Sequence, residues 1–256
     1  MIQTAKDFEI IKVGDMVITK PEFDYLGDAK ITEPTRVIRV IGGQEGYFEL
    51  EGKKNCYKGV VLQKVEKTEE KNEIVKGKVE QTMDVSQPLF TIGIKDEETD
   101  TKERVRKHIA IEILLNMIIG KSSKLYKELY EQGILFVTPG LDYEFARGYA
   151  HVLITGQSSE PEKVYEKFKQ RVAEMKNAPI ESNEFNRIKK RIYGGYVKEY
   201  NDTADIARMF LADFFKEINS FDYLEEMTTI NEQYVEQVLK EVFDDKKMVI
   251  SVIKKA

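Results

Sequence analysis

The sequence predicts an α+β protein: a mostly antiparallel sheet with helices on one face, preceded by a small β-barrel-like module. Three observations support this prediction. Short apolar runs punctuated by glycine fill residues 1–66. A charged stretch, KTEEKNEIVKGK, covers residues 67–78 and is typical of a linker. Residues 79–256 then combine strand patterns with apolar residues at helical spacing.

Composition excludes several partner classes. Charged residues make up 33% of the 256 residues, yet their formal sum is only −5, so no basic face for nucleic acid is expected. The longest apolar run, 109–119, is interrupted by Glu112 and Asn116 and is too short to cross a bilayer. Cys56 is the single cysteine, so no internal disulfide can form. With no signal-peptide pattern at its start, the sequence favours a cytoplasmic protein without membrane partners.

The first module reads as a series of short strands. Val13–Ile18 begins with a turn pair, and Arg36–Ile41 mixes polar and apolar positions before Gly42-Gly43. Tyr47–Leu50 and Gly59–Leu62 complete the series. Short strands at this spacing predict a small barrel or sandwich, of which an SH3-like barrel is our interpretation.

The second module begins with a strand pattern over 82–94 and a helix over 101–119, in which Val105, Ile109 and Ile113 share one face. Gly120 ends that helix, and Ser122 or Ser123 can cap the next, which extends to Gly133. The remaining elements expected in order are strands over 134–138 and 143–155, helices over 161–177, 182–196, 203–218 and 231–243, and a final strand over 248–253.

The sequence offers little catalytic chemistry. It contains His108, His151 and one cysteine, and it lacks H-x-x-E-H, H-E-x-x-H and C-x-x-C, so we expect no metal site and no catalytic residue. His108 and Glu112 share a helical face, a spacing more typical of a surface contact. His151 is interpreted as a half-buried strand histidine. Tyr193, Tyr196 and Tyr200 form a helical stripe that favours core packing, with a peptide groove as the alternative.

One segment carries a family resemblance. Residues 120–134, GKSSKLYKELYEQGI, resemble a stretch in the second, non-catalytic half of insulinase-like (pitrilysin-type) zinc peptidases. Further resemblance lies in MDVSQPLFTIGIKD at 83–96, GQSSEPEKV at 156–164, FNRIKKR at 185–191 and INSFDY at 218–223. It covers 79–256 and does not extend to 1–66.

The resemblance implies different roles for the two halves of the peptidase. In this family the first half supplies H-x-x-E-H and a distal glutamate that hold zinc, and the two halves enclose a peptide. This chain would then hold no cofactor itself, and zinc is expected in a catalytic partner alone. The second half contributes an Arg/Tyr pair to substrate contacts, for which Arg147 and Tyr149 are the candidates here. The alternative is an ordinary exposed arginine and a strand-face tyrosine.

Three functions remain open from the sequence. The first is a non-catalytic subunit that binds peptide and completes the chamber of a zinc metallopeptidase supplied by an H-x-x-E-H-bearing chain. The second is a stand-alone protein-binding or scaffold protein on a repurposed peptidase fold. The third is a fragment of a full zinc metallopeptidase. In each case the expected partner is a peptide or protein.

Overall fold

The computed structural model describes residues 16–19, 35–41, 47–50, 56–58, 62–64, 74–97, 99–146 and 148–256. The chain divides into two compact units, 1–69 and 70–256, and each is described by itself. None of the described helices combines the length and apolarity needed to cross a membrane.

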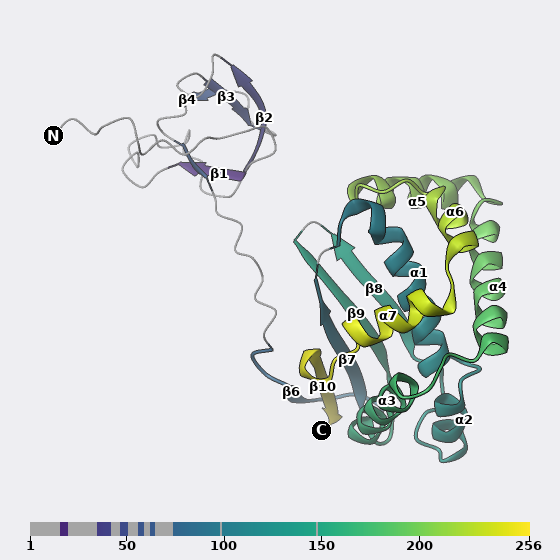
Figure 1. Ribbon diagram of the computed structural model, residues 1–256. Coiled ribbons are helices and arrows are strands. Elements are labelled where there is room, and N and C mark those ends of the chain that lie inside the picture. Colours follow the sequence, from purple (N-terminus) through teal and green to yellow (C-terminus); the bar gives the residue numbers. More distant parts are fainter. Residues whose placement is uncertain are drawn as a thin grey trace. The chain divides into compact units, whose positions relative to one another are not determined.

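The described part of the first unit is a five-stranded antiparallel sheet (Figure 1). Val37 and Leu50 are buried and pair directly across two neighbouring strands. Residues 20–34 and other parts of this unit lie outside the described residues, and the SH3-like barrel stays a prediction. The strands are β1 (Met16–Thr19), β2 (Thr35–Ile41), β3 (Tyr47–Leu50), β4 (Cys56–Lys58) and β5 (Leu62–Lys64), in the order β4-β3-β2-β1-β5.

The second unit is built on a sheet of order β6-β10-β7-β9-β8. The β10–β6 pair is parallel and the other pairs are antiparallel, as predicted for a mostly antiparallel sheet. Buried side chains alternate along β7, which directs Phe90, Ile92 and Ile94 into the core. The strands are β6 (Lys78–Met83), β7 (Leu89–Asp96), β8 (Gly140–Ala146), β9 (Tyr149–Gln157) and β10 (Met248–Lys255).

The helices cover one face of this sheet (Figure 1). Helices α1, α3 and α7 pack against its strands, and α4 and α6 pack on α1. The helices are α1 (Thr101–Ile118), α2 (Lys124–Glu131), α3 (Pro161–Lys176), α4 (Ser182–Glu199), α5 (Thr203–Phe215), α6 (Asp222–Thr229) and α7 (Glu232–Val242).

Three local predictions differ from the structure. The segment 134–138 is not a strand: Leu135 makes one isolated bridge to Ser158, and the apolar run reflects burial of Ile134 and Leu135. The single strand expected over 143–155 is the β8–β9 hairpin, which turns near Gly148 at a φ of 96°. Helix α6 was not predicted, because it lacks the serine cap that marked the equally short α2 and begins at Phe221 without a side-chain cap.

Candidate functional site

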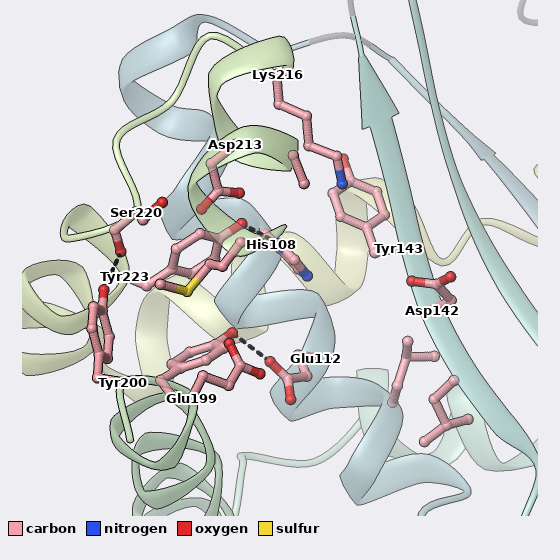
Figure 2. Close-up of a pocket in the computed structure, with 15 residues that line it drawn as sticks. His108, Glu112, Asp142, Tyr143, Glu199, Tyr200, Asp213, Lys216, Ser220 and Tyr223 are labelled. Carbon is pink, nitrogen blue, oxygen red and sulfur yellow. Dashed lines mark hydrogen bonds between the residues drawn. The ribbon is translucent and has the colours of Figure 1, made fainter. Parts of the chain in front are cut away.

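A pocket of about 370 Å³ lies between β8, α1, α4 and α5 (Figure 2). We call it the carboxylate pocket because four acidic side chains line it. Tyrosines and a histidine supply much of the rest of its wall. The four acidic residues are Glu112, Asp142, Glu199 and Asp213.

Helix α1 contributes His108 and Glu112, one turn apart on the same face. Nδ1 of His108 lies 2.8 Å from the Tyr223 hydroxyl, within hydrogen-bond distance. The His108 ring also lies against the rings of Tyr143 and Phe145. Burial, with a smaller effect from the Lys216 ammonium, lowers the pKa of His108 to about 4. His108 is therefore neutral at physiological pH.

Glu112 faces the stripe of tyrosines on α4. The Tyr196 hydroxyl donates a hydrogen bond of 2.5 Å to Oε2 of Glu112. Burial raises the pKa of the Glu112 carboxyl, and the Tyr196 bond opposes that shift. Tyr196 and Tyr200 both line the pocket, whereas Tyr193 is 43% exposed and does not. Part of the predicted stripe is thus a pocket wall.

Asp213 is the buried acid of the pocket. It comes from α5, where its neighbours Phe214 and Phe215 are exposed, and its own exposed fraction is 7%. Burial raises the pKa of its carboxyl, against smaller effects of the Ser220 hydroxyl and the Lys216 ammonium. The Asp213 carboxylate and Ser220 face each other at this wall, and neither Oδ2 of Asp213 nor Oγ of Ser220 has another hydrogen-bond partner among the described residues (Figure 2).

The wall nearest the sheet carries charges of both signs. Nζ of Lys216 lies 3.5 Å from Oε2 of Glu144 on β8 and 4.8 Å from the centre of the Phe145 ring. Burial and the neighbouring Glu144 raise the pKa of the Asp142 carboxyl. The Lys216 ammonium is therefore directed toward Glu144, at the side of the pocket.

The pocket does not have the donor geometry of a zinc site. Catalytic zinc needs three converging protein ligands. No group of three or more His, Cys, Asp or Glu side chains in the described part of the chain could hold a metal ion. His108 and Glu112 instead engage the hydroxyls of Tyr223 and Tyr196. These donors do not fit the zinc ion of the peptidase family.

Tyr149, one of the two predicted peptide-binding residues, is not among the residues that line this pocket. Arg147 lies outside the described residues. Tyr149 opens β9, is 42% exposed, and its ring stacks on His151 at 5.7 Å between centres. His151 is partly buried in β9, as predicted for a half-buried strand histidine. Arg147 and Tyr149 stay predictions.

The expectation that His108 and Glu112 form a surface contact was wrong. Both are partly buried in the pocket wall and do not form a surface contact. Helical spacing identified their shared face, but α4, α5 and α6 cover that face only after folding. Asp213 was also missed, and the available signal was one acid within the apolar run FLADFF.

Comparison with known proteins places the chain in a family. Residues 45–192 match the family described as the peptidase M16 inactive domain. The uncharacterized zinc protease YmfH of Bacillus subtilis (strain 168) is 26% identical over 199 residues, which are 75% of this chain and 46% of YmfH. This chain thus spans about half the length of that relative.

Solved structures agree on the fold. An M16-like peptidase from Alicyclobacillus acidocaldarius matches with a TM-score of 0.69 at 19% identity, over 73% of this chain and 45% of that one. The inactive peptidase domain of a zinc protease from Bordetella parapertussis matches with a TM-score of 0.58 at 8% identity, over 69% and 95%. Both matches show the same fold. The family match confirms the resemblance, and it begins at residue 45, within the first 66 residues that were expected to lie outside it. The chain therefore belongs to the family of peptidase M16 inactive domains.

Proposed function

We propose that this chain is the non-catalytic half of a zinc metallopeptidase, which binds peptide and completes a chamber with a catalytic half on another chain. The proposal rests on the family match and on the fraction of a related zinc protease that this chain spans. The chain matches an inactive domain and spans 46% of a zinc protease. In the peptidase family that the chain resembles, H-x-x-E-H belongs to the other half.

Peptide binding is supported by the position of β8. This strand ends the sheet order, and its outer edge has no strand partner among the described residues. An extended peptide can add to such an edge through backbone hydrogen bonds. Leu141, Asp142 and Tyr143 of β8 also line the carboxylate pocket, so a peptide on this edge would lie beside it.

Affinity purification of the tagged full chain from its own cells tests the proposal. We expect a stoichiometric partner that carries H-x-x-E-H, identified by mass spectrometry, and a complex that contains zinc. Recovery of the chain alone, or with a partner lacking that motif, would contradict the proposal.

Two other functions give different outcomes. A stand-alone scaffold on the peptidase fold would be recovered with a partner unrelated to peptidases. A piece of a longer metallopeptidase, which the half-length match also favours, would have H-x-x-E-H encoded in the same or an adjacent reading frame. Sequencing of the surrounding gene region separates these two alternatives.

A further inference from the structure

Helix α5 presents two opposite faces, and the described chain covers one of them. The inner face lines the carboxylate pocket through Met209, Ala212 and Asp213. The outer face carries exposed apolar side chains in two adjacent rows at i, i+4 spacing. Phe221, which precedes α6, extends this face because its ring meets the Phe210 ring edge-on, at 5.2 Å between centres. We call the exposed apolar residues of this face the α5 stripe, and they are Phe210, Leu211, Phe214, Phe215 and Phe221.

The α5 stripe is a contiguous apolar surface. Phe214 and Phe215 are each 73% exposed, and their rings are in edge-on contact at 5.8 Å between centres. Since a covered aromatic side chain buries about 150–250 Å², the stripe exposes roughly 500 Å². Single exposed apolar residues are ordinary on proteins, whereas a continuous patch of this size marks an interaction surface. The stripe therefore has the extent of the apolar centre of a protein interface.

Helix α5 also lacks the buried apolar face that stabilises most helices. Isolated helices shorter than about 12–15 residues are marginal in water, and helices in proteins gain most of their stability from packing an apolar face. Helix α5 has 13 residues, and its one buried side chain is Asp213. None of the described elements packs along α5 as closely as α4 and α6 pack along α1. The large apolar side chains of α5 thus contribute little packing within the described chain.

The C-terminal end of α5 is nevertheless held at a defined position. Nη1 of Arg104 on α1 donates a hydrogen bond of 2.8 Å to the carbonyl oxygen of Lys216, the residue that follows α5. Nζ of Lys216 pairs with Glu144 on β8 at 3.5 Å. These contacts fix the last turn, which carries Phe214 and Phe215, relative to α1 and the sheet. The stripe is therefore presented outward from a fixed end of the helix.

The composition of α5 and the length of its relatives favour a protein partner from the same peptidase. Helices that lie on membranes carry a polar face rich in lysine and arginine, whereas the charged residues within α5 are Asp205, Arg208 and Asp213. The chain spans 46% of YmfH and 45% of the M16-like peptidase from Alicyclobacillus acidocaldarius, so each relative has about as much chain again. An apolar face on one half of such a protein suits a contact with the other half.

We infer that the α5 stripe is the surface through which this chain binds the H-x-x-E-H-bearing catalytic half, with Phe214 and Phe215 at the centre of the contact. The identity of this partner rests on the proposed function. The assignment of an interaction surface rests on α5 alone. Because the inner face of the same helix lines the carboxylate pocket, the contact would bring the catalytic half close to that pocket.

The test measures the affinity of the purified full chain for the H-x-x-E-H-bearing chain recovered by affinity purification, using biolayer interferometry. The variant combines Phe214→Ala and Phe215→Ala, which remove two exposed rings and leave the core unchanged. We expect it to bind about 30-fold or more weakly, because aromatic side chains at the centre of an interface dominate its affinity. The matched control is Phe136→Ala, an exposed phenylalanine between α2 and β8, which should bind within about twofold of the original chain. Circular dichroism of each variant confirms folding.

Hydrogen exchange followed by mass spectrometry gives a second readout that needs no variant. The amides of α5 should exchange about tenfold or more slowly in the complex than in the chain alone, because covering the stripe supplies the packing that α5 lacks. Equal exchange of these amides in the two samples would overturn the inference.

The remaining outcomes separate this inference from the proposed function. If the original chain binds the catalytic half and the double variant binds it equally well, the inference is overturned and the proposed function stands. If the original chain binds no H-x-x-E-H-bearing chain, the proposed function fails and this assignment of the partner fails with it. Sedimentation velocity of the chain alone tests the other occupant: a dimer that the double variant dissociates, with unchanged affinity for the catalytic half, would assign the stripe to a second copy of this chain and overturn the inference.

Discussion

Helices α1 and α5 are both rich in apolar residues, yet the fold treats them in opposite ways. Ile109, Ile113 and Met117 of α1 are buried, and the helix packs against α4, α6, α7 and β8. In α5, Leu211 is 58% exposed and Phe214 is 73% exposed, and Asp213 alone among its described residues is buried. The comparison teaches that apolar composition predicts a helix without predicting what covers it.

The two helices also differ in how they are anchored. Buried Asp96 on β7 accepts a hydrogen bond from the Tyr143 hydroxyl and forms an ion pair with Nζ of Lys107 on α1, both at 2.7 Å. Helix α5 instead begins at an exposed cap, Asp202, whose carboxylate accepts from two backbone amides. The core is therefore expected to unfold with α1, and α5 is expected to open independently.

The largest expected effect contrasts one apolar residue from each helix. Ile113→Ala should lower the free energy of unfolding by about 2–5 kcal/mol, because it leaves a cavity in the core. Leu211→Ala should change that free energy by less than about 0.5 kcal/mol, because the side chain already contacts water. Urea denaturation followed by circular dichroism measures both. Equal losses of unfolding free energy in the two variants would contradict the difference in burial between α1 and α5.

The second prediction removes the polar anchor of α1. Asp96→Ala should lower the free energy of unfolding by about 3 kcal/mol, because it leaves the Lys107 ammonium without its counter-charge and the Tyr143 hydroxyl without its acceptor. The matched change on α5 is Arg208→Ala, which removes an exposed ion pair with Asp205 and should cost less than about 0.5 kcal/mol. Urea midpoints of the two variants give the contrast. An unchanged urea midpoint for Asp96→Ala would show that the contacts of Asp96 contribute nothing to stability.

The third prediction concerns acid stability at the junction of the two helices. The pKa of His108 is lowered from 6.5 to about 4 in the folded chain, so the unfolded chain takes up the proton first. The stability that this neutral histidine contributes is fully present above pH 6.5 and is lost as pH falls toward 4. The shift corresponds to roughly 3 kcal/mol at the acid end.

His108→Gln isolates this effect. The pocket carboxylates have raised pKa values and therefore act with the opposite sign, but they are present in both proteins. The difference in unfolding free energy between the original chain and the variant, measured at steps from pH 7 to 4, should shift steadily in favour of the variant. A difference independent of pH would contradict burial of a neutral His108.

The smallest expected effect compares two helix caps. Ser123 is buried, and its Oγ accepts from the backbone amide of Tyr126 at the start of α2. Ser123→Ala should cost about 1 kcal/mol of global stability. Asp202→Ala should leave global stability nearly unchanged and speed hydrogen exchange of the α5 amides, because α5 buries little against the core. Protection of α5 equal to that of α1 would refute the independent opening.

Much of the fold was predictable from local patterns. The helix expected over 101–119 ends one residue earlier, and Ser123, one of the two serines predicted as possible caps, is the N-cap of α2. The loop at 134–138 was mistaken for a strand because burial there is tertiary and has no period. Local pattern therefore recovers elements whose burial repeats along the chain.

The pocket was not predictable in the same way. His108 and Tyr223 are 115 positions apart and meet only in the folded chain. Asp213 and Ser220 come to the same wall through the turn between α5 and α6, which no sequence period marks. What the sequence did provide was the family resemblance, which the comparison confirmed.

Reconstitution tests the central claim most directly. The purified chain, its H-x-x-E-H-bearing partner, and an equimolar mixture of the two are each incubated with zinc and a mixed peptide pool, and cleavage is followed by mass spectrometry. We predict cleavage by the mixture and little or none by either chain alone. Cleavage by this chain alone, or a partner equally active without it, would contradict the account of a non-catalytic half that completes a peptidase.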